Sequence, residues 1–574
     1  MTMQPPTSAR PRALLATASV AVALAAADTY VVVLALQDMM NGVGLGVDAL
    51  QKATPIISGF LLGYIAVLPL IGRLADLVAR QRILVGCLLL FVVGSAITAI
   101  SVDLSVMVAG RFLQGVGGGG LVPATLALVA DLWPPGKRGT PLGVVGAVQE
   151  IGSVIGPLLG APILAVSDWR MIFWLNAVAG LVLAAAVLLV GGRGQSDAAD
   201  RSRVPWWWSV LTAVAALAAF VLLGLALWAP GALTTSIRWG GPFVPYGDST
   251  ARLATQIGVW GLIALAVLIA LSVRYWWRTV RRIDVVGALL IALALGALVL
   301  TFAASNPEKQ VVGPMGYWLL PVAAVAAALY AWRQRTAPSP LIARGVVVGR
   351  VRPALVVSLC VGTAIVAIVV DIPVLARLTV TSSQTEAALI LLRFLVAVPV
   401  GALLGGWLLR RLGPAYVAAP GLLLSALALF QMSTWGTNTL DAWPLPTVML
   451  ALAGLGVGVA IAPVNDAALY DAPRSAHGVV SSLVVVARMI GMVVGLALLT
   501  AIGLHRFYAR VQSLSNPSEE TVTAAGIVQV QTVFLGAAIV ALVAAAVALL
   551  LGRQVSEVTD EPAARGIGDV ALDD

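Results

Sequence analysis

Apolar runs of about 20 residues recur from one end of this chain to the other, and they constrain its fold more than any other feature. The hydrocarbon core of a bilayer is about 30 Å thick, so a helix needs about 20 mostly apolar residues to cross it. The composition agrees, because 60% of the 574 residues are hydrophobic and only 11% are charged. The sequence therefore predicts an all-α, polytopic membrane protein with about 16 spans.

Polar breaks between these runs predict four parts. We expect a six-helix bundle over residues 1–190, a linker with two extra helical pairs over 191–352, a second six-helix bundle over 353–551, and an acidic tail over 552–574. Transporters are often built from two related halves of this kind.

Internal repeats support the division into two halves. The segment GGWLLRRLGP, Gly405–Pro414, is a degenerate copy of the charged loop Gly72–Arg82 at the matching place in the first half. Asp371, in the first helix of the second half, corresponds to Asp28 in the first helix of the chain. The two halves are therefore expected to be related by pseudo-symmetry.

The net charge of +9 would suggest a nucleic-acid partner in a soluble protein. Here, however, most of the 35 Lys and Arg residues lie at the ends of the apolar runs, on alternate sides. The positive-inside rule explains this bias if both termini are cytoplasmic. We predict a multi-pass protein of the cell (inner) membrane with both termini in the cytoplasm, and no nucleic-acid partner.

Several kinds of site are not expected from the sequence. The chain has only two cysteines and two histidines, and they do not cluster, so we expect no disulfide, no metal site and no cofactor. No lysine is followed by Ser or Thr, which excludes the G-K-[ST] loop of an ATP-driven pump.

Six ionisable side chains lie inside apolar runs. Inserting one charged side chain at the centre of a membrane-spanning helix costs about 2.5 to 3.5 kcal/mol on insertion scales. Such a residue is therefore interpreted by default as functional, and a partner of opposite charge is expected for it. We predict that these residues form ion pairs in the interior and that a carboxylate which loses its arginine binds a proton. The predicted proton-coupling residues are Asp28, Arg111, Glu150, Asp371, Arg393 and Arg488. The alternatives are a silent ion pair for Glu150 and a structural hydrogen-bonding role for Asp28.

Glu150 lies in a helix with regularly spaced glycines, GVVGAVQEIGSVIGPLLGAPI. The spacing places small residues on one face and allows a neighbouring backbone to approach closely. Gly143, Gly152, Gly156, Pro157 and Gly160 resemble the antiporter signature of the drug:proton antiporters in the major facilitator superfamily. Arg488 with its two following glycines is the counterpart in the second half, with the charge reversed.

The loop GRLADLVARQR provides a second resemblance. Gly72, Asp76, Arg80 and Arg82 match the cytoplasmic loop motif of the superfamily, with Ala in place of one glycine. A carboxylate there can cap a helix N-terminus while the arginines stay in the interface. We predict a cytoplasmic gating loop; the alternative is an ordinary charged turn.

Together these motifs resemble the 14-helix drug:proton antiporter subfamily. Within it, ADTY, AVQEIGSVIGP and VVVARMIGMVVGLALL are similar to the mycobacterial type of triacylglyceride and multidrug exporter. The resemblance implies the major facilitator fold and proton-coupled export of hydrophobic substrates, lipids such as triacylglycerides or drugs, by alternating access. It also implies membrane lipids, protons and a periplasmic lipid-binding lipoprotein as partners. Four linker helices instead of two are a departure from that subfamily.

Other functions remain open at this point. An exporter of small drugs only would have the same apolar pathway. A membrane-embedded lipid-modifying enzyme would need a His/Asp or Ser/His/Asp cluster at one membrane face, and the two histidines lie on opposite sides of the predicted membrane. A receptor or scaffold would leave the embedded charges without a role.

Overall fold

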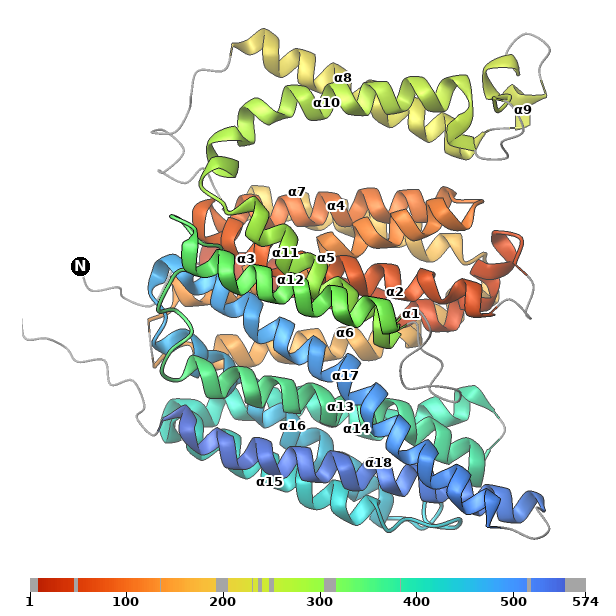
Figure 1. The fold of residues 1–574 in the computed structure, drawn as a ribbon, viewed down its shortest axis with the longest axis vertical. Helices are drawn as coiled ribbons and strands as arrows, with labels where there is room; N and C mark the ends of the chain where they lie inside the picture. The colour runs from red at the N-terminus through yellow and green to blue at the C-terminus, as the bar shows by residue number, and fades with distance from the viewer. Residues whose placement is uncertain are drawn as a thin grey trace, which may run out of the picture.

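The computed structural model describes residues 9–45, 50–134, 136–191, 205–229, 231–235, 240–246, 252–303, 316–381, 383–513 and 518–552. These residues form long α-helices that run side by side (Figure 1). Fifteen helices among them are long and apolar enough to cross a membrane, and a further helix, α12, lies alongside. The predicted all-α, polytopic fold is confirmed.

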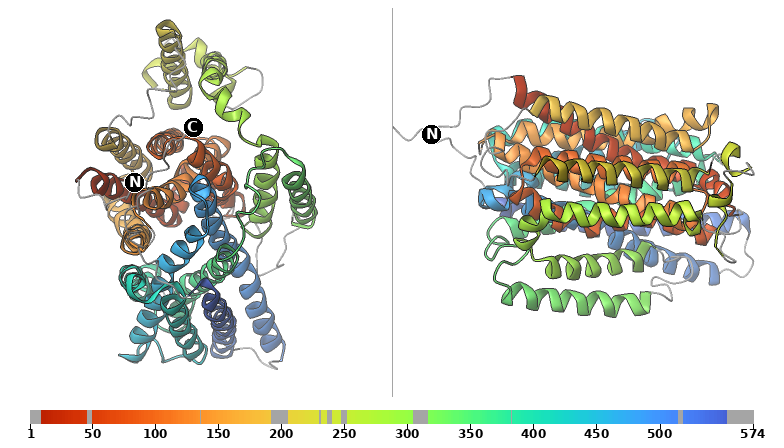
Figure 2. Two further views of the ribbon diagram at one scale, coloured as in Figure 1. Left: turned by 90° about the vertical axis from the view of Figure 1, so that its left-hand side faces the viewer. Right: turned by 90° about the horizontal axis from the view of Figure 1, so that it is seen from above.

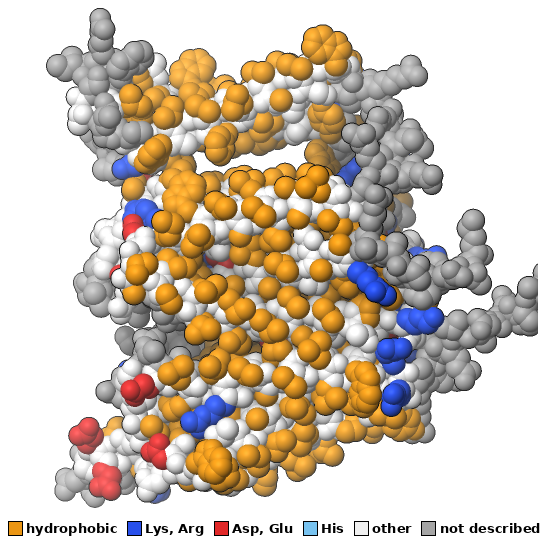
Figure 3. Space-filling view, turned by 180° about the vertical axis from the view of Figure 1, so that it is seen from behind, with side chains coloured by type: hydrophobic (Ala, Val, Ile, Leu, Met, Phe, Trp, Pro, Cys, Tyr) orange, Lys and Arg blue, Asp and Glu red, His pale blue; other side chains and the backbone are white. Residues whose placement is uncertain are grey.

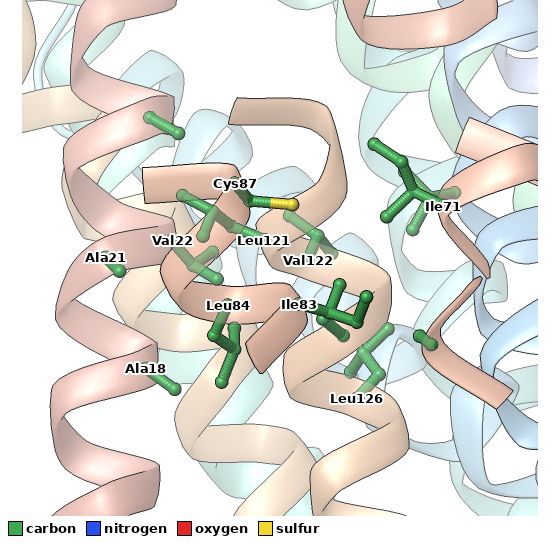
Figure 4. Close-up of a cluster of buried hydrophobic side chains, with 14 of the residues drawn as sticks. Ala18, Ala21, Val22, Ile71, Ile83, Leu84, Cys87, Leu121, Val122 and Leu126 are labelled. Carbon is green, nitrogen blue, oxygen red and sulfur yellow. The ribbon is translucent and has the colours of Figure 1, made fainter. Parts of the chain in front are cut away.

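The first half of the chain forms six spans, one of which is broken. Its helices are α1 (Ala9–Gly42), α2 (Leu50–Ala66), α3 (Leu68–Leu77), α4 (Arg80–Ile100), α5 (Leu104–Leu132), α6 (Gly139–Val166) and α7 (Arg170–Gly191). Pro69, which has no backbone N–H, lies at the start of α3, and the break between α2 and α3 falls just before it. Figure 4 shows part of the core of this half, where Val22, Leu84 and Val122 pack together from three helices.

The second half repeats this arrangement. Its helices are α13 (Val351–Thr379), α14 (Gln384–Leu412), α15 (Pro414–Met432), α16 (Leu445–Tyr470), α17 (His477–Gln512) and α18 (Glu519–Ala548), with short 3-10 helices η5 (Arg474–Ala476) and η6 (Leu549–Leu551). The start of α1 and the end of α18 lie at the same end of the bundle (Figure 1). The acidic tail lies outside the described residues beyond Gly552.

Four long helices connect the halves, as the sequence predicts. They are α8 (Trp206–Trp228), α10 (Gln256–Arg281), α11 (Val285–Ala303) and α12 (Gly316–Thr336), with short α9 (Gly231–Thr234), η3 (Gly241–Phe243) and η4 (Arg252–Ala254). Helix α11 packs against α2, α3 and α17, and α12 packs on α11. The pair α8 and α10 lies apart from the main body (Figures 1 and 2).

Hydrophobic side chains cover most of the middle of the molecule, and most of the charged side chains visible in Figure 3 lie toward its two ends. This banding is what a bilayer requires, because apolar side chains meet the hydrocarbon and charged ones meet water. The two halves contact each other mainly through α3 with α17 and α6 with α14. Functional groups shared by the halves must therefore lie near these four helices.

Candidate functional site

Asp28 lies deep inside the first half, on α1, with 1% of its surface exposed. Arg111 donates from Nη1 to Asp28 Oδ2 at 2.6 Å. The side-chain amides of Gln114 and Asn176 donate to Asp28 Oδ1 at 2.8 Å and 2.6 Å. Gln114 also donates to Ser95 Oγ at 2.9 Å. One cation and two amides thus balance the carboxylate in the protein interior.

Arg111 is held in place by groups from α2, from α7 and from its own helix α5, as well as by Asp28 on α1. Its Nη1 donates to Gln114 Oε1 at 2.7 Å, and its Nε to the carbonyl oxygen of Ile56 at 3.4 Å. The guanidinium carbon lies 4.5 Å from the ring centroid of Phe60 and 5.7 Å from that of Phe173. These rings shield the charge from lipid and add cation–π attraction.

Asn176 and Ser95 carry no charge or motif that marks them as site residues in the sequence. Each is a single uncharged polar residue in an apolar helix, and such residues often bond only to their own backbone. The available signal for Asn176 was its position at the end of the segment DWRMIFWLN on α7. The structure shows that this position faces Asp28 on α1.

Glu150 and Arg488 form the second ion pair, and it joins the two halves. Glu150 lies on α6 and Arg488 on α17, with Oε1 and Nη1 separated by 3.9 Å. Their side chains are 14% and 10% exposed. The distance exceeds that of a hydrogen bond, so this pair is looser than the pair of Asp28 and Arg111.

Two neighbouring narrow cavities lie beside this pair, and the unfilled space in and around them, about 470 Å³ and 650 Å³, includes space open to solvent. Arg488, Gln149 and Val122 line both cavities. The larger one takes its walls from α1, α2, α5 and α6 of the first half and from α13 and α17 of the second. Its apolar lining is Val22, Ala26, Phe60, Leu61, Val122, Ile365, Met489 and Met492. An apolar ligand held there would contact both halves and the ion pair.

The glycines of the antiporter motif contact two different partners. Gly152 and Gly156 lie against the backbone of α1 at Ala23 and Ala27, where a Cβ atom would clash with main-chain atoms. Gly160 is also buried. Gly143 instead lies against the carbonyl of Ala402 on α14. The side chain of Pro157 lies outside the described residues.

The same arrangement recurs in the second half, as the repeat predicts. Gly491 on α17 lies against the backbone of Leu359 on α13, and Gly495 lies against Thr363. Helix α17 therefore packs on α13 as α6 packs on α1. This packing brings Arg488 to the interface opposite Glu150.

The segment predicted as a gating loop is mostly helical: Gly72 and Asp76 lie in α3, Arg80 and Arg82 lie in α4, and only Val78 and Ala79 connect them. It contacts the start of α17. Asp76 accepts hydrogen bonds from the backbone N–H groups of Gly478 at 2.7 Å and Val479 at 3.1 Å. Arg80 bridges Asp76, at 3.1 Å, and Asp131 at the end of α5, at 3.0 Å. A carboxylate at a helix N-terminus satisfies free N–H groups and opposes the positive end of the helix dipole. The loop thus ties the two halves together.

Other groups complete this contact. His477, the first residue of α17, is 2% exposed, and its Nδ1 lies 3.6 Å from Asp131 Oδ1. Gly72 packs directly against Gly478, and a Cβ atom on either would meet the backbone of the other. Arg82 is exposed. Asp131 and His477 both lie outside the loop motif, so the sequence pattern gives no signal for their part in this contact.

A second close crossing lies on the other side of the molecule, between α6 and α14. Gly139 and Gly143 pack against the backbone of Gly406 and Ala402, again with no room for a Cβ atom. Gly406 belongs to the degenerate loop repeat. The two loops therefore occupy equivalent places, one beside the start of α17 and one beside the start of α6.

The third expected ion pair is not found among the described residues. Asp371 on α13 is 2% exposed, and its Oδ2 has no hydrogen-bond partner there. Arg393 on α14 is half-buried and lies on the same helical face as Val396 and Val400, which are exposed. This face is the lipid-facing side of α14, opposite the side that meets α6. Helix rotation thus separates two charges that the sequence grouped together.

The described residues contain no group of three His, Cys, Asp or Glu side chains that could hold a metal ion. The functional groups gathered here are instead two acid–base pairs, an apolar cavity and two glycine crossings.

Comparison with known proteins gives concordant matches. The family model of the Major Facilitator Superfamily matches residues 18–308 and 249–496. A triacylglyceride transporter of Mycobacteroides abscessus is 35% identical over 512 residues, which cover 87% of this chain and 83% of that protein. A triacylglyceride transporter of Mycobacterium tuberculosis is 35% identical over 519 residues, covering 88% and 85%.

Solved structures agree at the level of the fold. The human organic anion transporter MFSD10 has a TM-score of 0.54 at 15% identity, covering 95% of this chain and all of that one. A double tryptophan mutant of XylE has a TM-score of 0.55 at 13% identity, covering 96% and 98%.

Proposed function

Because the chain belongs to the major facilitator superfamily and is a multi-pass membrane transporter rather than an enzyme, we propose that it exports apolar lipids in exchange for protons by alternating access. The observation that carries this proposal is the pair of Glu150 and Arg488. The two residues come from different halves and meet beside an apolar cavity at 3.9 Å. Movement of the halves and protonation of Glu150 both break the same contact.

The coupling follows from the cost of leaving a charge alone in a low-dielectric interior. When Glu150 binds a proton from the exoplasmic side, it no longer attracts Arg488, and the halves are released to open toward the cytoplasm. Loss of the proton to the cytoplasm restores the pair. The proton gradient supplies roughly 1.4 kcal/mol per pH unit, and the membrane potential about 2.3 kcal/mol per charge per 100 mV.

Asp28 is proposed as a second proton site. Its carboxylate is buried with Arg111 and two amides in the same half as Glu150. It does not line either cavity, so a proton would reach it through the polar side chains around it. Asp371, without a partner on Oδ2, is proposed as a further proton site in the second half.

A lipid is the substrate class that the cavity and the relatives favour. The cavity is lined by aliphatic side chains, methionines and Phe60, and methionine adapts to irregular apolar shapes. The relatives described above are named triacylglyceride transporters. We therefore infer a triacylglyceride or similar neutral lipid, with hydrophobic drugs as secondary substrates.

The setting that we propose is the cell (inner) membrane, with both termini and the Gly72–Arg82 loop in the cytoplasm. The close crossings at that loop then make the present conformation the one closed toward the cytoplasm. An apolar substrate released into water needs a carrier, so a periplasmic lipid-binding lipoprotein is the proposed partner. The exposed end of α17, with Arg506 and Arg510, lies on that side.

Reconstitution in proteoliposomes tests the coupling. With an imposed pH gradient, the wild-type protein is expected to transport a fluorescent triacylglyceride across the vesicle membrane. Protons should move in the opposite direction, and the resulting change in the pH of the vesicle lumen should depend on transport of the lipid. Glu150→Gln and Asp28→Asn are expected to lower gradient-driven transport at least tenfold, whereas Asp441→Asn, an exposed carboxylate in a loop, is expected to leave it unchanged. Undiminished gradient-driven transport by both variants would refute proton coupling through these residues.

A further inference from the structure

An open slot separates the pair α8 and α10 from the rest of the molecule. Figure 3 shows it passing between the pair and the main body, with hydrophobic side chains along both walls. Among the described helices, α4 is the one with appreciable contact to α8 across it. Helices α8, α4 and α7, on its two sides, carry exposed apolar side chains, among them Val210, Val214, Leu217, Leu89, Val93, Val178 and Val182, although exposure alone does not assign each of them to the slot. The pair is thus tied to the body at few points.

The slot lies at the depth of the hydrocarbon. Helices α8 and α10 are both long and apolar enough to cross the membrane, and neither contains an acidic residue. Water has no polar partners along such walls, so burying it there is unfavourable. Acyl chains fit this space because they match the walls in polarity and can adapt to its shape.

Charge is concentrated at one end of the pair, on the side of the Gly72–Arg82 loop. The guanidinium of Arg274 lies 5.1 Å from the ring centroid of Trp208, and that of Arg281 lies 4.8 Å from that of Trp277. Both arginines are exposed, as is the adjacent Arg282. Stacking on tryptophan holds a guanidinium at the membrane interface while its N–H groups stay available.

Among the described residues near this end of the pair, no acidic side chain is paired with Arg274 or Arg281. The next acidic residue along the chain, Asp284, is buried and accepts from Arg333 Nε at 3.0 Å. At the opposite end of the pair, Arg252 donates to the backbone carbonyl oxygens of Leu227 and Trp228. That arginine is therefore used internally, and within the part of the pair that the structure describes the exposed arginines lie at the loop side.

We propose that the α8–α10 pair binds an anionic phospholipid of the adjacent leaflet. The acyl chains lie in the slot between the pair and α4 and α7, and the phosphate lies against Arg274 and Arg281. Arginine suits this contact because its planar fork donates two parallel hydrogen bonds to a phosphate. The inference does not depend on what the central cavity transports.

Native mass spectrometry of the full-length protein tests this site. The protein is titrated with phosphatidylglycerol or with phosphatidylcholine, and the amount of each lipid that stays bound is measured. The test variant is R274Q/R281Q. The matched control is R410Q/R411Q, because these two arginines are exposed at the same end of the molecule and Arg411 lies 4.7 Å from the ring centroid of Trp407. Both doubles remove two positive charges and one or two cation–π contacts from the interface, but only the first double lies on the α8–α10 pair.

We expect the wild-type protein to retain phosphatidylglycerol in preference to phosphatidylcholine, and R274Q/R281Q to weaken phosphatidylglycerol binding about tenfold or more. R410Q/R411Q should bind like the wild type. Dihexanoyl phosphatidylglycerol should bind more weakly than the dioleoyl form, because its chains leave the slot unfilled.

Three outcomes would overturn the proposal. Equal losses in the two doubles would mean that surface charge in general retains the lipid, and unchanged binding in both would remove the arginines from the site. Displacement of the lipid by millimolar inorganic phosphate would indicate a plain anion site without a role for the chains.

Discussion

At the level of single residues, the two ion pairs differ in how firmly they are held. Asp28 and Arg111 are 2.6 Å apart, are almost fully buried, and share hydrogen bonds with Gln114. Glu150 and Arg488 are 3.9 Å apart and border a cavity. A buried charge with several donors is costly to disturb, whereas a loose pair can part at lower cost. The interface pair is therefore better suited to open during transport.

The firm pair leads to a prediction about stability. Arg111→Gln leaves the Asp28 carboxylate buried without its cation, which should cost about 3 to 5 kcal/mol of unfolding free energy. The double variant D28N/R111Q removes both charges and should recover a large part of that loss. Denaturation of the purified protein in detergent, followed by tryptophan fluorescence, measures both. If D28N/R111Q were less stable than Arg111→Gln, the pairing of these two charges would not be the source of the effect.

At the level of helices, close backbone packing decides where the functional groups lie. Gly152 and Gly156 let α6 approach α1, and Gly491 lets α17 approach α13. With side chains at these positions, each helix would be pushed outward, and Glu150 and Arg488 would no longer meet. The glycines therefore position the ion pair without touching it.

Glycine substitutions test this packing. Gly152→Ala and Gly156→Ala place a Cβ atom against main-chain atoms of Ala23 and Ala27, which cannot move as a side-chain end can, so each should destabilise by about 1 to 3 kcal/mol. Gly224→Ala on α8 is the control, because nothing lies within 4 Å of its Cβ position. It should be neutral or slightly stabilising. Thermal unfolding in detergent compares the three variants. Equal unfolding temperatures for all three would contradict the close approach of α6 to α1.

These helices also show what the sequence could and could not predict. Regular glycine spacing and isolated charges in apolar runs identified Asp28, Glu150 and Arg488 correctly as interior groups, because both signals are local. Contacts across 148 residues, such as that of Asn176 with Asp28, depend on how helices rotate against each other. The same holds for Arg393, since hydropathy does not tell which face of a uniformly apolar helix meets lipid.

At the level of the whole molecule, the two halves meet at two glycine crossings that are related by pseudo-symmetry but not by chemistry. At one, Gly72 packs on Gly478, and Asp76 four residues later caps α17. At the other, Gly406 packs on Gly139, and the residue four positions later is the exposed Arg410. Among the described residues, the first crossing has a carboxylate bonded to backbone N–H groups of the facing helix, whereas at the second the charge contact is the attraction between Arg138, just before α6, and the buried Asp466 of α16.

This asymmetry predicts how the conformational equilibrium responds to substitution. Asp76→Asn keeps the size of the side chain but weakens its bonds to Gly478, Val479 and Arg80. The loss of about 1 to 2 kcal/mol should raise the ratio of the open to the closed form at this end by about tenfold. Arg410→Gln, at the equivalent position of the second loop, should leave the ratio unchanged.

Distance measurements between the halves can determine the ratio of the open to the closed form in these two variants. Spin labels at Lys137 and Ser475, which are exposed on the two halves at the loop end, report the separation by electron–electron double resonance in lipid nanodiscs. Asp76→Asn should increase the population at the longer distance. If Asp76→Asn and Arg410→Gln shifted the distribution equally, the two crossings would contribute alike, and charge capping of α17 would not be what holds the closed form. If neither shifted it, packing of the glycines alone would keep the halves together.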